Sequence, residues 1–364
     1  MAKKLKGSYR LWRKIIPLAI VAVTVVAISV WIFWTERHPE KERELRIFVQ
    51  EQLQEWFPEK MELPDELIGF VPVGNSTDDR ARPMAVLLHG LDEPGGIWDE
   101  LVPALNKAGI AAIEFRYPND QAVDHSTDLL AEHWTELSTQ NPVVLIGHSM
   151  GGLVIRDFVS RWRHPVGSQP RIGGPPVCGV ILIATPNQGS EWARLRVWLE
   201  LREQFTDIVK RRFSLFAALR DGTGAAKIDL TPGSDFLVEL NSRPWPRSVP
   251  VCMVGGLLAK QVPAAAENLV ALTEELGATD LADRFEQWLA ETGEELGDGV
   301  VPVSSLELEH APPPILVEAS HRGLLVRDSS TDDEPPAIRP VLDTLAARKD
   351  CLMGLEPAEN NLSR

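Results

Sequence analysis

The sequence contains little cysteine: three residues, Cys178, Cys252 and Cys351, among 364. Three cysteines are too few for a disulfide framework, and no CxxC pair or cysteine–histidine cluster indicates a metal site. Cys178 and Cys252 both fall in apolar, strand-like segments, which favours buried free thiols. A bridge between these two is the alternative, and it would require suitable geometry.

Basic charge is scarce beyond the N-terminus. The formal net charge is −15, and because the first 14 residues carry six cations and no acid, the rest of the chain carries −21. This acidic charge on the chain after residue 14 argues against nucleic acid as a partner, since phosphate contacts need a basic face. The composition, 44% hydrophobic and 24% charged, is that of a globular protein with one large domain plus appendages or two small domains.

One segment lacks charge altogether. Residues 15–34 read "IIPLAIVAVTVVAISVWIFW", 20 residues that as a helix would measure about 30 Å, the thickness of a bilayer core. The cations before it place the arm, residues 1–14, in the cytosol and the body on the extracytoplasmic side of the membrane. The alternatives are a cleaved signal peptide, whose apolar core would be shorter, and a buried helix of a soluble protein.

Residues 35–80 are predicted to be a stalk or linker between this span and the body. Within it, residues 39–57 have the pattern of a charged amphipathic helix, which either stands free or packs on the domain. Its apolar residues near one face are Leu45, Phe48, Val49, Leu53 and Trp56.

From residue 84 onward, apolar strand-like runs alternate with helical patterns, and no internal repeat is present. Such an alternation predicts an α/β fold with a mostly parallel sheet covered by helices on both faces. Active sites in such sheets lie at the carboxyl ends of the strands. The predicted strands are 84–90, 109–118, 142–149, 176–186, 249–257 and 313–320, and the predicted helices among them are 99–108, 126–137 and 150–162.

The segment "GHSMGG", residues 147–152, contains the pattern G-x-S-x-G between a predicted strand and a predicted helix. This context is that of a nucleophile elbow, in which a tight turn holds Ser149 in a strained backbone conformation. The flanking glycines remove side chains that would clash, and the helix N-terminus favours an oxyanion beside the hydroxyl. The alternative is a purely structural glycine-rich turn.

With its neighbouring segments, this elbow resembles the α/β-hydrolase family and, within it, the lipase-like branch. The likeness covers about residues 82–325 and rests also on "LLHGL" (87–91), "ATPNQGS" (184–190), "GDGVVPVSS" (297–305) and "SHRGLL" (320–325). The resemblance implies an α/β-hydrolase catalytic domain over residues 81–345, followed by a tail, 346–364. It also implies that the backbone amides of Leu91 and Met150 form the oxyanion hole.

A serine nucleophile needs a base, and the base needs a carboxylate that fixes its tautomer. In this family the order along the chain is serine, acid, histidine, which points to His321 as the base. His164 follows the elbow helix too closely, and His310 precedes a proline-rich turn as a surface residue would. His148 should point away from the serine hydroxyl, and His89 is expected to pack or hydrogen-bond within the oxyanion loop.

Asp298 is the predicted acid, in a Gly-Asp-Gly turn 23 residues before His321. The family's acid usually follows its strand closely, whereas about 40 residues separate Val254 from Asp298 here. We therefore interpret residues 258–297 as a helical insertion. The alternative is a turn aspartate that merely caps a loop.

Residues 191–248 form a second insertion, with apolar residues at roughly helical spacing from Trp198 to Leu219. In this family such an insertion is commonly a cap, and a mobile cap with an apolar underside would gate an acyl chain. Plain packing within the domain is the alternative.

These predictions converge on a membrane-anchored serine hydrolase that cleaves carboxylic esters, with lipid-like acyl esters favoured by the membrane span and the apolar cap. Ser149, Asp298 and His321 would be the catalytic triad, and no cofactor or metal is implied. An acyltransferase, an amidase or a thioesterase could use the same residues. A catalytically inactive hydrolase fold that serves as a binding protein is the alternative from a different class.

Overall fold

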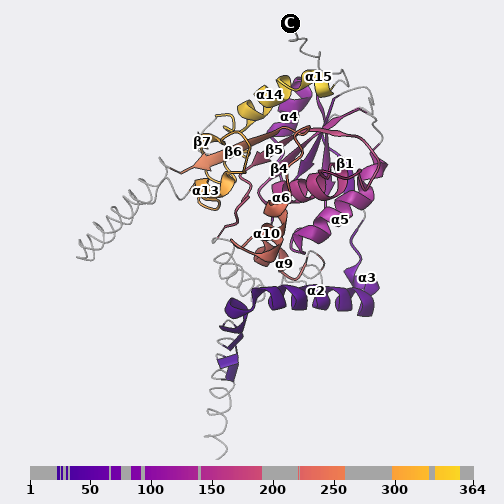
Figure 1. Ribbon diagram of the computed structural model, residues 1–364, viewed down its shortest axis with the longest axis vertical. Coiled ribbons are helices and arrows are strands. Elements are labelled where there is room, and N and C mark those ends of the chain that lie inside the picture. Colours follow the sequence, from indigo (N-terminus) through magenta and orange to yellow (C-terminus); the bar gives the residue numbers. More distant parts are fainter. Residues whose placement is uncertain are drawn as a thin grey trace, which may run out of the picture.

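The computed structural model describes most of the chain from residue 38 to residue 352 (Figure 1). The described ranges are 38–64, 67–74, 83–91, 95–137, 141–190, 222–258, 297–327 and 333–352, together with residue 220 and parts of 23–37.

Seven strands form one sheet in the order β1-β3-β2-β4-β5-β6-β7. Strand β1 runs antiparallel to β3, and every other neighbouring pair is parallel, which confirms the predicted mostly parallel sheet. The antiparallel edge strand β1 was not predicted, because four residues carry too short a pattern. The strands are β1 (Gly69–Pro72), β2 (Met84–Leu88), β3 (Ala111–Arg116), β4 (Val143–His148), β5 (Val177–Ile183), β6 (Val251–Leu257) and β7 (Ile315–Glu318).

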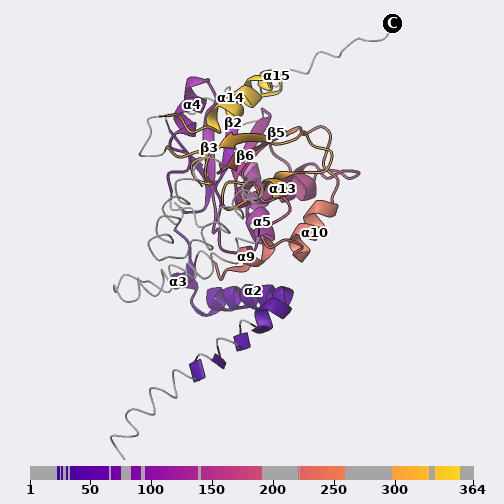
Figure 2. The ribbon, with the colours of Figure 1, turned by 90° about the vertical axis from the view of Figure 1, so that its left-hand side faces the viewer.

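Helices cover both faces of the sheet (Figures 1 and 2). The described helices are α2 (Pro39–Trp56), α3 (Pro58–Met61), α4 (Leu101–Lys107), α5 (Val123–His133), α6 (Met150–Asp157), α9 (Ala225–Asp229), α10 (Asp235–Ser242), α13 (Val303–Leu306), α14 (Ile338–Ala346) and α15 (Lys349–Leu352). A 3₁₀ turn (Trp134–Glu136) follows α5, and a π-helical segment (Phe158–Arg163) continues α6.

The two faces of strand β4 show why the sequence contains continuous apolar runs. Leu145 belongs to one buried cluster with Leu153 of α6, whereas its neighbour Ile146 belongs to a second cluster with Leu105 of α4 and Val341 of α14. Successive strand residues point to opposite faces, so a sheet covered on both sides needs apolar residues at every position.

Tertiary contacts shift some predicted boundaries. Helix α5 begins at Val123, three residues before the predicted start, because the Asp229 carboxylate accepts the Val123 backbone N–H at 2.8 Å. A carboxylate at this position satisfies one of the donors that a helix N-terminus leaves unpaired. Helix α14, which was not predicted as an element, packs through the buried residues Ile338, Val341 and Leu345.

Several predicted segments lie outside the described residues. They are most of the membrane span 15–34, residues 191–219 of the predicted cap, and residues 259–296 of the helical insertion. In the part of the chain that the structure describes, no helix combines the length and apolar character that crossing a membrane requires.

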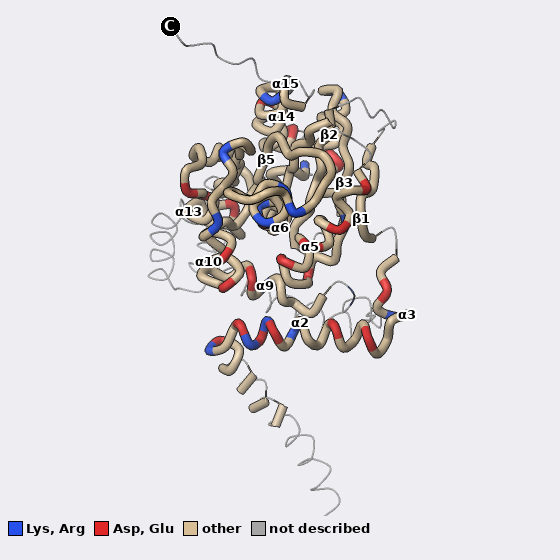
Figure 3. The backbone as a smooth tube through the Cα atoms, turned by 45° about the vertical axis from the view of Figure 1, so that its right-hand side comes forward, with Lys and Arg blue, Asp and Glu red and all other residues tan. Residues whose placement is uncertain are grey.

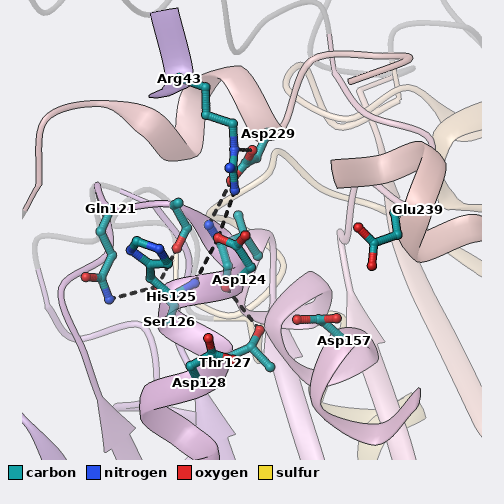
Figure 4. Close-up of polar contacts among 12 residues, drawn as sticks. Arg43, Gln121, Asp124, His125, Ser126, Thr127, Asp128, Asp157, Asp229 and Glu239 are labelled. Carbon is teal, nitrogen blue, oxygen red and sulfur yellow. Dashed lines mark hydrogen bonds and ion pairs between the residues drawn. The ribbon is translucent and has the colours of Figure 1, made fainter. Parts of the chain in front are cut away.

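Helix α2 carries both acidic and basic residues along its length (Figure 3) and contacts the domain through Arg43 and Arg46. Arg43 Nε donates to Asp229 Oδ1 at 2.5 Å, and Arg43 Nη2 donates to Asp124 Oδ1 at 2.8 Å (Figure 4). One turn further on, Arg46 donates to the Thr223 carbonyl, and Thr223 Oγ1 donates to the Arg46 carbonyl at 2.7 Å. Of the two arrangements that the sequence allowed, a free stalk and a packed helix, the structure has the second.

All three cysteines are free, so Cys178 and Cys252 do not form the bridge that the sequence left open. Cys178 is buried, and burial raises the pKa of its thiol well above the ordinary value. A buried thiol in apolar surroundings is protonated and inert, which fits a packing role.

Candidate active site

Ser149 lies at the sharp turn between β4 and α6, as the elbow motif predicts. Its backbone has φ 53° and ψ −126°, a conformation that residues other than glycine rarely adopt. The turn is held by the Ser149 N–H, which donates to the Ile183 carbonyl of β5 at 2.8 Å. A Cβ at Gly147 would lie 2.6 Å from the Gly152 nitrogen, so the strand and helix can approach this closely only with glycine there. The strain is therefore stored at one residue by the packing around it.

Asp298 and His321 form a hydrogen-bonded pair. His321 Nδ1 lies 2.7 Å from Asp298 Oδ2, and the His321 backbone N–H donates to the Asp298 carbonyl at 3.0 Å. The other carboxylate oxygen, Oδ1, accepts the backbone N–H groups of Val300 and Val301 at 2.9 and 2.8 Å. Asp298 is buried, and with three donors around it the carboxylate is held in one orientation. A proton on His321 Nδ1 is thereby favoured, which leaves Nε2 as an acceptor.

The long gap between β6 and Asp298 has a structural explanation. The backbone N–H of Leu258, directly after β6, donates to the carbonyl of Gly297 at 2.8 Å. Leu258 and Gly297 therefore lie side by side, although 38 residues separate them in the sequence. In three dimensions Asp298 follows its strand closely, as the acid of the α/β-hydrolase pattern should.

The segment 184–190 fixes the loop that carries Asp298. Asn187 Nδ2 donates to the Leu306 carbonyl at 2.6 Å, and Ser305 Oγ donates to the Gly189 carbonyl at 2.6 Å. Ser190 Oγ also donates to the Val300 carbonyl, next to the amides that hold the carboxylate. The lipase-like sequence "ATPNQGS" thus has a structural role here, because it ties β5 to the acid loop.

His148 connects the elbow to the acid–base pair, and the sequence did not indicate this contact. Its ring lies 4.7 Å from the ring of His321, centroid to centroid, and its Nε2 donates to the His321 carbonyl at 3.2 Å. Burial, followed by the nearby His321, lowers the pKa of His148 well below 6.5, so its ring is neutral. Because His148 precedes Ser149, this contact brings His321 to the elbow. No local signal in the sequence could have identified a packing partner 173 residues away.

The predicted oxyanion loop lies against the nucleophile. A Cβ built on Gly90 would come within 2.8 Å of Ser149 Cβ. The loop is held by Tyr117, whose hydroxyl donates to the His89 carbonyl at 2.5 Å and whose ring stacks on that of His89 at 4.5 Å. His89 is therefore a packing and hydrogen-bonding residue, as predicted. Leu91 follows Gly90 directly, and Met150 is the first residue of α6; both are buried.

The two remaining candidate histidines take other roles. His164 Nε2 accepts the Val177 backbone N–H at 3.1 Å, and burial lowers its pKa to about 4. The His310 side chain is 89% exposed. Neither is hydrogen-bonded to Asp298, whereas His321 is.

A cavity of about 770 Å³ adjoins the oxyanion loop. Its walls include the segment after α3, the residues after β1, the loop before α4 with the first turn of α4, the carboxyl ends of β2 and β3, and Arg220. Lining residues include Leu63, Leu67, His89, Trp98, Tyr117 and Arg220. A cavity of this size and mixed lining is in the range of small-molecule sites. Within the described ranges, no group of three His, Cys, Asp or Glu side chains could hold a metal ion.

Comparison with solved structures finds proteins of similar architecture at low sequence identity. The Bacillus licheniformis lipase BlEst2 aligns with 76% of this chain and 97% of its own, at 17% identity and a TM-score of 0.48. The Legionella pneumophila phospholipase PlaB aligns with 75% of this chain and 62% of its own, at 17% identity and a TM-score of 0.45. The metagenomic carboxyl esterase MGS0156 aligns with 77% of each chain, at 17% identity and a TM-score of 0.47.

Curated protein sequences include no significant match. A family model, described as the alpha/beta hydrolase family, matches residues 85–357, three quarters of the chain. The matched region begins at β2 and contains the elbow, the acid loop and His321. The chain belongs to the α/β-hydrolase family.

Proposed function

We propose that the protein is a serine hydrolase that cleaves carboxylic esters through Ser149, His321 and Asp298. The observation that carries this proposal is the 2.7 Å contact between His321 Nδ1 and the buried Asp298 carboxylate beside a strained serine elbow. A structural turn has no need for a buried carboxylate hydrogen-bonded to a histidine next to it. The pair has the arrangement that a base and its orienting acid require.

In the proposed mechanism, Ser149 Oγ attacks the acyl carbonyl carbon while His321 Nε2 takes its proton. The backbone N–H groups of Leu91 and Met150 donate to the oxyanion, and the tetrahedral intermediate expels the alcohol, which receives the proton from His321. Water then attacks the acyl-enzyme with His321 again as base, which releases the carboxylic acid and regenerates the serine. Asp298 stays ionised and stabilises the imidazolium form of His321 in both steps.

The proposal includes a membrane anchor over residues 15–34, with residues 1–14 in the cytosol and the hydrolase domain on the extracytoplasmic side. Twenty uncharged residues after six cations support this arrangement. A membrane-bound hydrolase meets acyl lipids at high local concentration, so lipid-like esters are the favoured substrates. Of the predicted cap, residues 222–248 pack into the domain core through Phe236, Leu237 and Leu240, which is the plain packing that the sequence left open. The rest of the predicted cap, residues 191–219, would cover the site and gate an acyl chain.

The test is hydrolysis of a nitrophenyl ester series, from short to long acyl chains, by the full-length protein in detergent micelles. We expect Ser149→Ala to abolish turnover and the matched control Ser160→Ala, a buried serine on the same helical segment, to retain it. Preference for long chains would indicate a lipase and preference for short chains an esterase.

A fluorophosphonate probe, which modifies activated serines, separates the alternatives. Probe labelling of Ser149 without ester hydrolysis would redirect the proposal to an amidase, a thioesterase or an acyltransferase. A folded protein that neither hydrolyses esters nor reacts with the probe would be a non-catalytic member of the family, and the proposed function would be wrong.

A further inference from the structure

All three cysteines lie on one face of the sheet, in the same apolar cluster. Cys178 is the second residue of β5, Cys252 is the second residue of the neighbouring strand β6, and Cys351 belongs to α15. The fold brings these residues together, since 173 positions separate Cys178 from Cys351 along the chain. A single buried cysteine is an ordinary packing residue, but two thiols in contact can be oxidised to a disulfide.

Cys351 is the cysteine that contacts Cys178. Its Sγ lies 4.0 Å from the Cys178 carbonyl oxygen, and its thiol is also a hydrogen-bond partner of the Cys178 thiol. Cys252, by contrast, contacts Thr344 of α14, whose hydroxyl donates to the Cys252 Sγ at 3.3 Å. The structure thus pairs Cys178 with Cys351 and not with Cys252, the partner that the sequence left open.

The two paired thiols differ in their access to solvent. Cys178 is 5% exposed, whereas Cys351 is partly exposed and lies in a helix of only four residues. Burial raises the pKa of the Cys178 thiol, and the neighbouring Cys351 raises it further. Because the thiolate is the attacking form, a reagent from solution reacts with Cys351 first. Burial keeps such a reagent away from Cys178, but it does not separate Cys178 from Cys351.

We propose that Cys178 and Cys351 are a redox pair, which a small-molecule disulfide such as oxidised glutathione converts into a disulfide bond between β5 and α15. The Cys351 thiolate attacks one sulfur of the oxidant and expels one glutathione thiolate. Cys178 then attacks the Cys351 Sγ and expels the second glutathione, whose sulfur receives the proton that Cys178 loses. Two protein thiols are oxidised, and one molecule of oxidant is reduced to two thiols.

The bond stabilises the folded protein because of the length of chain that it closes. A crosslink across 173 positions restricts the unfolded chain strongly and leaves the packing around α15 in place. Leu352, the last residue of α15, is already buried in the same cluster, so the helix needs little movement to bring the two sulfurs together. We expect oxidation to raise the midpoint of urea unfolding by about 1 M.

The pair lies at the opposite end of the strands from the catalytic residues. Strands β4 and β5 run parallel, with Val143 beside Val177 at their amino ends and His148 beside Ile183 at their carboxyl ends. Five positions along β5 separate Cys178 from Ile183, which corresponds to about 16 Å. Oxidation therefore acts on stability and not on the site, and the proposal holds whether or not the protein hydrolyses esters.

The test is peptide mapping of the folded full-length protein in detergent micelles after incubation with oxidised glutathione. Remaining thiols are blocked with N-ethylmaleimide in urea, and the chain is digested with trypsin without reduction. Arginine and lysine residues place each cysteine in a peptide of its own: 172–194, 248–260 and 350–364. We expect peptide 172–194 to be linked to peptide 350–364, and peptide 248–260 to carry N-ethylmaleimide.

Two variants sharpen this test. Cys252→Ser is the matched control and should form the same link. Cys351→Ser replaces a partly exposed thiol, so the protein should fold, retain Cys178 as a free thiol and show no change in urea midpoint with the oxidant. A link between peptides 172–194 and 248–260, glutathione that stays on Cys351, or two unmodified thiols would overturn the proposal. An unchanged urea midpoint in the linked protein would refute the stabilising effect.

Discussion

Arg43→Met tests the contact that joins α2 to the hydrolase domain. Methionine retains much of the apolar stem and removes the cation that faces Asp229, whose side chain is fully buried, at 2.5 Å. The remaining partners of that carboxylate include the Val123 N–H at 2.8 Å. Removal of one member of a buried ion pair costs about 3–5 kcal/mol, because the other charge stays buried without compensation.

The pKa of Asp229 sets the pH dependence of this cost. Burial raises the pKa to about 6 from the ordinary 3.8, although Arg43 acts in the opposite direction. Ionising this group in the folded protein therefore costs about 3 kcal/mol, at roughly 1.4 kcal/mol per pH unit. The stability gained from holding the proton is complete below pH 3.8 and is lost as the pH rises through about 6. Without Arg43 the folded-state pKa rises further, and the loss extends to higher pH.

We therefore expect Arg43→Met to lower the free energy of unfolding by about 3–5 kcal/mol at pH 8. At pH 5, where Asp229 holds a proton in both proteins, the loss comes from the hydrogen bonds and from the part-exposed ion pair with Asp124, and we expect about 1–2 kcal/mol. The measurement is urea unfolding of the detergent-solubilised chain at both pH values, followed by the fluorescence of its tryptophans.

Two further variants serve as controls. Arg339→Met breaks an exposed pair with Asp343 and should change the stability by less than about 0.5 kcal/mol. Combining Arg43→Met with Asp229→Asn removes the buried charge and should strongly reduce the pH dependence of the destabilisation, because of the two carboxylates that pair with Arg43 only Asp124 still titrates. An equal effect of Arg43→Met at pH 5 and pH 8 would refute the reasoning.

Three other predictions concern the site. Asp298→Asn should lower kcat for ester hydrolysis by about 10⁴, because the amide favours the wrong tautomer of His321, and an unchanged kcat would remove Asp298 from the proposed triad. Gly90→Ala should lower kcat for ester hydrolysis by about 100-fold, since the new methyl group would come within 2.8 Å of Ser149 Cβ and displace the nucleophile, and an unchanged kcat would show that the loop yields instead. Ser305→Ala should destabilise the fold by about 1–3 kcal/mol in urea titrations, because the Gly189 carbonyl loses its buried donor, and a neutral result would show that the acid loop does not depend on this contact.

The elbow and the parallel sheet could be predicted because their signals are local. The signals are the apolar runs of β2, β4 and β5 and the glycines around Ser149, and each lies within a short segment. Such a segment has few conformations that both pair its backbone hydrogen-bonding groups and bury its apolar side chains. The order of serine, acid and histidine along the chain then reduced the choice of base to His321. Asp298 was predicted correctly as the partner of His321, but the sequence could not explain its distance from β6.

Tertiary structure decided the contacts between residues far apart in the chain. Leu258 and Gly297 close the insertion, Asp229 determines where α5 begins, and His148 packs against His321, all across more than 35 residues. A sequence pattern indicates which residues favour burial or need a hydrogen-bond partner, but it does not identify the residue that becomes that partner.

Helix α2 shows most clearly which features follow from the sequence and which depend on the tertiary structure. By itself the sequence determined that residues 39–57 form an amphipathic helix, because its apolar and charged residues repeat with the helical period. Which face meets the domain was decided by the buried Asp229 carboxylate, 186 residues after Arg43. A buried charge without a partner is so costly that Arg43 faces the domain.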